Sequence, residues 1–292
     1  MEFDLQNYNC PLCYKDKTRP VLQKHGLSVV RCRECGFVYV NPRLKNEQIN
    51  SIYIHNYFKN KEYGYVGYEL QETLRKKNFS RWLKDAENFI PAGEHIRALD
   101  VGCAAGYCLD VMKARGWDTH GLELEEEMFN TLNASGYSVS KTRLEDFDTK
   151  DRYSVITLFD VIEHIPAIDK AFQRLHDLLE ENGVIIMVTP DHSSFQRKLF
   201  GKKWFQYKPI EHIQYFTKDT LNAFAERNGL QMKYHKHSGQ HADTDFIVNR
   251  LRYYNFSFLN KLFDKVFSVL QLKNRFFYVD TGSLLVVFKK KV

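Results

Sequence analysis

The stretch from residue 96 to residue 106 most constrains what this chain can fold into. It begins with the mostly apolar run Ile96–Val101, which predicts a short buried strand. Small residues over Gly102–Gly106 then predict a tight turn, and Tyr107–Arg115 has the pattern of a helix. Small side chains let a ligand approach the backbone, and the start of the helix offers it free N–H groups. This strand, turn and helix therefore predict a ligand site in an α/β fold.

A second acid indicates the class of ligand. Glu123 lies seventeen positions after Gly106, where a second parallel strand is expected to end. A carboxylate there can accept hydrogen bonds from both hydroxyls of a ribose. The dinucleotide fingerprint G-x-G-x-x-G is not present, because Ala104 and Tyr107 stand at its second and third glycine positions. The sequence therefore predicts a nucleoside-containing cofactor of another kind.

The turn resembles motif I of the class I S-adenosylmethionine-dependent methyltransferases, an Asp/Glu-x-Gly-x-Gly-x-Gly sequence, with Ala104 in place of the middle glycine. Three later stretches fit the same family in the right order. Leu144–Phe147 stands where the family places an acid or amide near the adenine amino group. Phe159–Ile165 closes the fourth strand, and Gly183–Pro190 matches the fifth strand with its preceding turn. The resemblance covers residues 96–235.

From residue 94 onward strands and helices alternate, which is typical of a doubly wound parallel sheet. The sequence predicts strands over 96–101, 119–124, 137–141, 155–160, 184–189, 231–236 and 284–288. It predicts helices over 73–89, 107–115, 167–179 and 217–228. With the resemblance, this implies an α/β protein with a Rossmann-like, doubly wound and mainly parallel sheet of seven strands.

The resemblance implies S-adenosylmethionine as the cofactor. The positions of this sequence expected to bind it are Asp100, Gly102, Cys103, Gly106, Tyr107, Glu123, Leu124, Glu145, Asp146, Phe159 and Asp160. Methyl transfer is an in-line displacement at a methyl group that the sulfonium already activates. The protein must therefore align the acceptor and, where this is a hydroxyl or a carbon acid, remove its proton.

Histidine suits proton removal because its pKa lies near neutrality. His164 follows the fourth predicted strand, and His212 stands in the pair Glu211-His212 after a long loop over 190–210. Glu211 could orient His212 or raise its basicity. The alternative for His164 is a role at the start of a helix or in the pocket wall. Weaker candidates, in a stretch expected to be flexible, are His237 and His241.

The first 42 residues carry two C-x2-C pairs separated by eighteen residues, and the cysteines are Cys10, Cys13, Cys32 and Cys35. Each pair can form a tight knuckle whose thiolates converge on one ion, so the spacing fits a zinc ribbon with a closed, structural Zn²⁺ site. The runs 29–31 and 37–40 predict a small hairpin. So short a segment would draw much of its stability from the metal. A pair of redox-active motifs is the alternative.

We expect three parts in the chain: the zinc-ribbon-like segment 1–42, a helical, aromatic-rich connector or lid over 43–92, and a methyltransferase domain over 93–292. Within the last part, the loop 190–216 is expected to form the acceptor site. The segment 255–272 has the spacing of an amphipathic helix, which packs within the chain, on a partner chain or on a membrane surface. The connector aromatics either line a pocket lid or pack on the main domain; they are Tyr53, Tyr57, Phe58, Tyr63, Tyr65, Tyr68, Phe79, Trp82 and Phe89.

Three features narrow the resemblance to the zinc-ribbon-bearing methyltransferases of bacterial polysaccharide and natural-product pathways: Asn41-Pro42-Arg43, Phe159–His164 and Glu211–Thr217. This implies O-methylation of a small molecule, such as a sugar, a nucleotide-sugar or a related metabolite. Sugar C-methyltransferases are partly similar but are usually longer. The alternatives are an RNA or protein methyltransferase that grips its polymer with the ribbon and the basic loop 197–208, and a non-catalytic scaffold.

Charge and composition limit the partners. The chain of 292 residues carries a formal charge of +6, which permits an anionic partner without requiring one. Amino-base methylation of nucleic acids commonly uses an Asn/Asp-Pro-Pro-aromatic motif, where this chain has Asp160-Val161-Ile162-Glu163, so nucleic acid is not favoured. No signal peptide and no apolar run of membrane-spanning length are visible, so we expect a cytoplasmic protein. The sequence leaves a homo-oligomer open.

Overall fold

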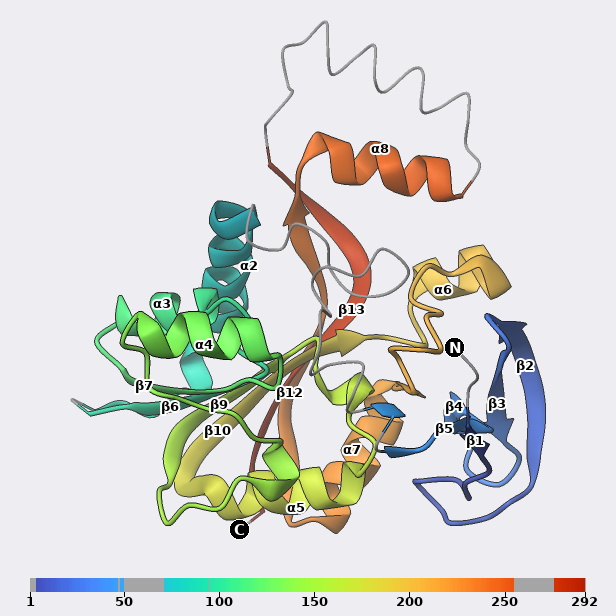
Figure 1. Cartoon of the computed structure of the whole chain (residues 1–292), viewed down its shortest axis with the longest axis horizontal. Helices are drawn as coiled ribbons and strands as arrows, with labels where there is room; N and C mark the ends of the chain where they lie inside the picture. Colours follow the sequence, from blue (N-terminus) through green and yellow to red (C-terminus); the bar gives the residue numbers. More distant parts are fainter. Residues whose placement is uncertain (1–3, 47, 50–70, 94, 255–275, 292) are drawn as a thin grey trace, which may run out of the picture.

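The computed structural model describes residues 4–46, 48–49, 71–93, 95–254 and 276–291. Its centre is a seven-stranded sheet in the order β12-β13-β10-β9-β6-β7-β8 (Figure 1). The strands are β6 Arg97–Val101, β7 Asp118–Leu122, β8 Val139–Ser140, β9 Tyr153–Phe159, β10 Leu179–Pro190, β12 Leu230–Ala242 and β13 Phe277–Lys290. The first five run parallel, whereas β13 is antiparallel to both of its neighbours. The predicted α/β class and the seven-stranded, mainly parallel sheet are confirmed.

Helices cover both faces of this sheet (Figure 1): α5 Ile168–Leu178 and α7 Lys218–Arg227 on one side, α2 Glu72–Asp85 and α3 Tyr107–Lys113 on the other. Successive side chains on a strand point to opposite faces, so each central strand feeds two cores. In β10, Ile185 and Met187 pack in the core with α5 and α7. Ile186 and Val188 pack in the core with α2 and α3. The near-continuous apolar runs of the sequence reflect this burial on both faces.

The helix boundaries follow the sequence with small shifts. Thr217 caps α7 by accepting a hydrogen bond from the Thr220 backbone N–H, as expected of a residue at that position. The helix predicted over 73–89 ends at Asp85 and continues as a 3-10 turn over Glu87–Phe89. Helix α4 (Glu126–Ala134) follows β7. The predicted helix 255–272 and the connector aromatics from Tyr53 to Tyr68 lie outside the described residues. Over the residues described, none of the helices has the length and apolarity that crossing a bilayer requires.

The two outer strands are longer than the predicted 231–236 and 284–288. Beyond the stretch in which β13 pairs with β10, β12 and β13 continue as a two-stranded hairpin that carries α8 (Thr244–Tyr253) away from the sheet (Figure 1). His237 and His241 of β12 both pair with residues of β13. The expectation that these two histidines lie in a flexible stretch is wrong, because ladder hydrogen bonds hold their backbone.

The N-terminal segment forms a second sheet in the order β11-β4-β3-β2, with strands β2 Thr18–Lys24, β3 Leu27–Cys32, β4 Val38–Val40 and β11 Gln214–Tyr215. The hairpin predicted over 29–31 and 37–40, on either side of the second cysteine pair, is confirmed by the pairing of β3 with β4. Strand β11 comes from the loop expected to form the acceptor site, and Gln214 pairs there with Tyr39. The N-terminal segment and this loop therefore share one sheet.

Apolar and polar contacts dock the N-terminal segment on the main sheet. The ring of Phe37 lies 5.6 Å from that of Phe216 and 5.3 Å from that of Phe224, between ring centroids. At the surface, Arg227 of α7 donates hydrogen bonds to the backbone carbonyls of Pro11 and Leu12. The first cysteine knuckle is thus held directly against a helix of the larger sheet.

Candidate active site

A pocket lies at the carboxyl ends of β6, β7 and β9. Ligands of open parallel α/β sheets bind at this edge, because the loops that leave the strands gather there. The pocket lining brings together six residues that the sequence assigns to a cofactor: Gly102, Glu123, Leu124, Glu145, Phe159 and Asp160. Four stretches far apart in the sequence therefore meet at one site.

The loop after β6 is compact and strained. Gly102 has a φ of 72°, and a Cβ added there would lie 2.8 Å from Val161 Cγ2. Ala104 has a φ of 47°, a left-handed conformation that costs a residue with a side chain about 1 kcal/mol. Gly106 caps α3 at a φ of 78°, and a Cβ there would overlap Leu132. This conformation exposes backbone to a ligand at close range.

The carboxylate of Glu123 ties this loop to the loop after β7. Its Oε2 accepts a hydrogen bond from the Ala104 N–H at 2.7 Å. Its Oε1 accepts hydrogen bonds from the N–H groups of Leu124 at 2.8 Å and Glu125 at 2.7 Å. Burial raises the pKa of Glu123, and these three bonds oppose the shift. A carboxylate has about four acceptor positions, so Glu123 retains capacity for a ligand hydroxyl while it organises both loops.

Asp100 lies outside the pocket lining. Thr157 Oγ1 donates a hydrogen bond of 2.6 Å to its carboxylate, and the side chain is buried. Burial raises the pKa of Asp100 to about 7, while the hydrogen bonds from Thr157 and Cys108 act in the opposite direction. Asp100 therefore joins β6 to β9 beneath the loop, and it would influence a ligand through that loop.

Helix α2 closes the pocket with aromatic rings. Phe79 stacks on Phe159 with 5.5 Å between ring centroids, and Trp82 lies 5.1 Å from the same ring. Both alternatives for these connector aromatics therefore hold, because the rings pack on the sheet and also line the pocket. The sequence analysis missed Arg75 and Asn78, which line the pocket from the same helix. Their spacing of four residues from Phe79 and Trp82 is the signal that could have found them.

A second pocket of about 1000 Å³ adjoins the first, since both are lined by Arg75, Asn78, Trp82 and Asp160. Asp160 has a φ of 55°. Burial raises its pKa to about 6, and the charges of Arg75 and Lys208 oppose this shift. The rest of the lining is rich in polar side chains, which include Gln206, His212, Gln240, Asp243, Thr281 and Ser283.

The two histidines predicted to act as bases meet between the pockets, with 4.9 Å between the ring centroids of His164 and His212. His164 Nδ1 lies 2.9 Å from the Glu211 carbonyl oxygen, and His212 Nδ1 lies 3.0 Å from that of Gln206. A carbonyl oxygen can only accept, so Nδ1 of each ring carries the hydrogen. Burial lowers the pKa of His164 to about 4 and that of His212 well below its usual range, so both are neutral at pH 7.

The carboxylate of Glu211 lies near a lysine. Its Oε2 is 3.4 Å from Lys208 Nζ. Its backbone carbonyl, by contrast, holds the ring of His164. Within the described residues, His212 Nε2 has no hydrogen-bond partner. Glu211 therefore contacts His164 through its backbone carbonyl, while its carboxylate pairs with Lys208.

Glu163, which the sequence analysis quoted only within a motif, is the acid beside the histidines. Ligand atoms of Glu163, His164 and His212 lie within 4.8 Å of one another. Thr189 Oγ1 donates a hydrogen bond of 2.9 Å to Glu163 Oε2. Burial raises the pKa of this carboxyl well above its usual range, and the Asp160 charge adds to the shift. Two imidazoles and a carboxyl at this spacing can share a proton or hold a divalent cation.

A family model described as a methyltransferase domain matches residues 70–235, which is more than half of the chain. The chain belongs to this methyltransferase family. The match begins just before α2 and ends within β12, so it includes the glycine-containing loop, Glu123 and the histidine pair.

Solved structures of S-adenosylmethionine-dependent methyltransferases share the fold of this methyltransferase domain. One from Archaeoglobus fulgidus is 16% identical, with a TM-score of 0.51 over 77% of this chain and 100% of that chain. One from Clostridium acetobutylicum is 12% identical, with a TM-score of 0.50 over 75% of this chain and 92% of that chain. At these identities the likeness concerns the fold alone.

Curated relatives of the methyltransferase domain include proteins named ubiquinone biosynthesis O-methyltransferase. The relative from Leptothrix cholodnii is 25% identical over 154 residues, 48% of this chain and 66% of its own length. The relative from Bradyrhizobium diazoefficiens is 22% identical over 150 residues, 46% of this chain and 58% of its own length. The matched part therefore spans less than two thirds of either relative.

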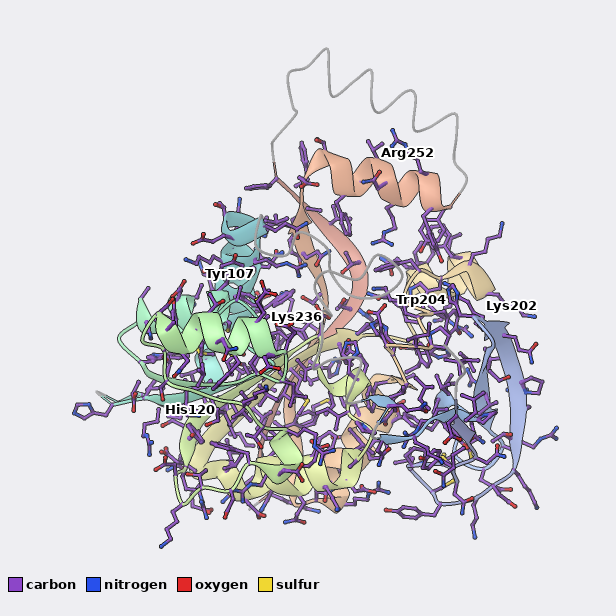
Figure 2. The ribbon with its side chains drawn as sticks, in the orientation of Figure 1. Tyr107, His120, Lys202, Trp204, Lys236 and Arg252 are labelled. Atoms are coloured by element: carbon purple, nitrogen blue, oxygen red, sulfur yellow. The ribbon has the colours of Figure 1, made fainter. Side chains whose placement is uncertain are left out.

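Of the other residues predicted for the cofactor, some lie in or next to the loop after β6, one lines the pocket and one lies outside it. Cys103 is buried within the loop, and Tyr107 begins α3 (Figure 2). Glu145 lines the pocket, and burial raises its pKa. Asp146 does not line the pocket, and its carboxylate forms an ion pair with Arg143, which does.

The four cysteines of the N-terminal segment converge on one point. The Sγ atoms of Cys10 and Cys35 are 3.5 Å apart, those of Cys13 and Cys32 are 3.4 Å apart, and all four lie within 4.8 Å of one another. None of the four forms a disulfide. Tetrahedral zinc with Zn–S bonds of about 2.3 Å needs sulfurs ~3.8 Å apart. The donor set and its spacing therefore fit Zn²⁺.

The geometry of the loop after β6 predicts that a methyl group at Gly102 would destabilise the fold. Gly102→Ala should lower the free energy of unfolding by about 2–4 kcal/mol, because overlap with the stiff Val161 side chain adds to the backbone strain. Gly116→Ala is the matched control, since Gly116 has a φ of 80° with nothing within 4 Å of its Cβ position, and it should cost about 1 kcal/mol. Urea unfolding measures both losses. Equal losses would mean that Val161 does not confine the loop.

Proposed function

We propose that this protein is an S-adenosylmethionine-dependent methyltransferase that methylates an oxygen of a small, polar acceptor, such as a sugar or a nucleotide-sugar. The observation that carries the proposal is the pair of adjoining pockets at the carboxyl ends of the parallel strands. Family membership and the shared fold support the cofactor. The names of the curated relatives support O-methylation of a small molecule.

The first pocket offers a partner for each part of the cofactor. We assign the ribose to Glu123, whose carboxylate retains acceptor capacity, and the adenine end to Glu145. Asp160 and Arg75 carry the opposite charges that the amino and carboxylate groups of a methionine moiety require. When bound, S-adenosylmethionine supplies a methyl group activated by its sulfonium. Phe79 and Trp82 exclude water from the pocket on the side of α2.

The second pocket is our proposed acceptor site. Amide, hydroxyl and carboxylate side chains line it from the loop after β10 and from the β12–β13 hairpin. Such groups both donate and accept hydrogen bonds, as the several hydroxyls of a sugar require. Trp82 also lines it and offers an apolar surface for one face of a sugar ring. The shared residue Asp160 marks where the acceptor oxygen would approach the cofactor.

We propose His212 as the general base. Its Nδ1–H is fixed on the Gln206 carbonyl, so the lone pair of the neutral ring is at Nε2. As the acceptor oxygen attacks the methyl group, its proton would move to Nε2. An imidazolium on His212 would favour the ionised form of the neighbouring Glu163, which would in turn stabilise it, and His164, held by the Glu211 carbonyl, packs against the ring and positions it.

The sequence assigns both Glu123 and Asp146 to the cofactor, but the cofactor assignment made here predicts that their substitution has unequal effects on affinity. Glu123→Ala should weaken S-adenosylmethionine binding by about 100-fold, because it removes a ribose acceptor and releases three backbone N–H groups of the loops. Asp146→Ala should have a much smaller effect, since Asp146 does not line the pocket and reaches it only through its surface ion pair with Arg143. Isothermal titration calorimetry measures both. Unchanged affinity in Glu123→Ala would remove the ribose assignment.

The base assignment predicts a loss of turnover with cofactor binding retained. His212→Ala should lower kcat by about 10²–10⁴-fold, the usual contribution of a general base, while Glu211→Gln should retain most activity. The lowered pKa keeps His212 unprotonated, so the wild-type rate should not fall between pH 8 and about pH 6.5, where an ordinary histidine is half protonated. Full activity of His212→Ala on a panel of nucleotide-sugars that the wild type methylates would rule it out as the base.

We propose that Cys10, Cys13, Cys32 and Cys35 hold one structural Zn²⁺ ion. Elemental analysis of the purified protein should give one zinc per chain, and Cys13→Ser/Cys35→Ser should lose it and unfold at a lower temperature. Cys103→Ser is the control for zinc content, because Cys103 lies outside the cluster of four cysteines. Metal retained by the double variant, or a zinc-free protein with an unchanged melting temperature, would contradict a structural zinc site.

A further inference from the structure

Helix α6 (Phe195–Phe200) turns two large apolar side chains to solvent. Phe195 is 71% exposed and Leu199 is 60% exposed, and their spacing of four residues places them on one face. The opposite side of the helix is anchored, because Phe200 stacks on Tyr254 with 3.5 Å between ring centroids. Ser194 caps the helix by accepting a hydrogen bond from the Arg197 N–H. The apolar face is therefore presented by a fixed element.

Lysines surround this apolar face. Lys198, Lys202 and Lys203 are exposed, and Figure 2 shows Lys202 at the outer edge of the molecule, beyond the buried Trp204. The sequence has no acid between Asp191 and Glu211. Over the part of the chain that the structure describes, none of the three lysines forms an ion pair. The patch therefore combines apolar side chains with uncompensated positive charge.

The N-terminal sheet extends the positive surface. Burial lowers the pKa of Arg31 of β3, and the charges of Arg197 and Arg19 lower it further. Arg197 and Arg19 therefore each lie near enough to Arg31 for their charges to repel its guanidinium group. A protein maintains such a concentration of like charge at little cost only where solvent or an anionic partner screens it.

The patch lies beside the proposed acceptor pocket. Gln196 of α6 donates a hydrogen bond of 3.1 Å to the backbone carbonyl of Asp280 in β13. The next residue, Thr281, lines the acceptor pocket, and so does Phe205, five residues after the end of α6. A surface that binds α6 would therefore lie next to the proposed acceptor pocket.

We propose that Phe195, Leu199 and the lysines at 198, 202 and 203 form a docking patch for the surface of an anionic lipid bilayer. Interfacial elements insert apolar side chains into the headgroup region while flanking lysines are attracted to anionic lipids. RNA would use the lysines but would leave Leu199 in water, because an aliphatic side chain offers no stacking surface to a base. Docking itself is independent of the proposed function. Its use, to methylate acceptors presented at a membrane, rests on that function.

Sedimentation of the full-length protein with lipid vesicles tests the proposal. The protein should bind vesicles containing phosphatidylserine at least about tenfold more tightly than vesicles of phosphatidylcholine alone, and salt should weaken the binding. Phe195→Ser/Leu199→Ser and Lys198→Glu/Lys202→Glu/Lys203→Glu should each reduce binding by about tenfold or more. The matched controls are Leu5→Ser, at another exposed apolar residue, and Lys84→Glu/Lys150→Glu/Lys233→Glu, which changes the net charge equally at exposed sites.

Three results would overturn the proposal. One is equal binding to both kinds of vesicle or to neither. Another is an equal loss in the control triple variant, which would mean that net charge alone attracts the protein. The third is tighter binding to a single-stranded RNA oligonucleotide that Phe195→Ser/Leu199→Ser leaves unchanged, which would identify a nucleic-acid surface. Calorimetry with S-adenosylmethionine shows whether each variant is still folded and binds the cofactor. Failure of docking would therefore contradict the docking patch and not the proposed methyl transfer.

Discussion

The pairing of β11 with β4 is the contact on which the geometry of the proposed acceptor site depends. It joins the segment that carries His212 to the N-terminal sheet, and the Val40 N–H donates a further hydrogen bond of 2.9 Å to the Ile213 carbonyl. From the other side, the Ile213 N–H donates to the Glu163 carbonyl at 3.1 Å, and Gln214 Nε2 donates to the Ile165 carbonyl at 2.6 Å. Main-chain bonds in two directions thus fix His212 between the N-terminal sheet and the turn after β9. The cysteine cluster can support the acceptor site without touching it, because it stabilises the sheet that this segment joins.

Strain and buried charge concentrate at the same edge of the main sheet. Two residues with side chains, Ala104 and Asp160, adopt left-handed backbone conformations there, and each costs about 1 kcal/mol. Asp100, Glu123 and Glu163 are buried carboxyls whose ionisation burial disfavours. Stability alone would not favour this arrangement, because apolar residues would fill the same space without these costs. Backbone strain and buried carboxyl groups of this kind are typical of ligand-binding sites.

Sequence patterns predicted what is local and left out what depends on contacts between distant segments. Alternating apolar runs gave the parallel strands, the spacing of Gly106 and Glu123 gave the two loops of the cofactor pocket, and the C-x2-C pairs gave the cysteine cluster. Strand β11 escaped prediction because two residues carry no periodicity, and its partner β4 lies far away in the sequence. The carboxylate of Glu211 lies by Lys208 and not His212 for a related reason, since neighbouring side chains point in different directions. A motif identifies residues in the sequence, whereas the contacts that these residues make depend on the fold.

The charge state of the buried groups indicates an order of binding. Burial drives Asp160 and Glu163 towards the protonated form and His164 and His212 towards the neutral form, while the charges of Arg75 and Lys208 favour an ionised Asp160. A cofactor with a cationic sulfonium and an ammonium group would favour the ionised form of Asp160, whose pKa of about 6 requires little energy to shift. We therefore expect the cofactor to bind first and to favour the ionised Asp160, after which the acceptor would meet a proposed base, His212, that is already neutral.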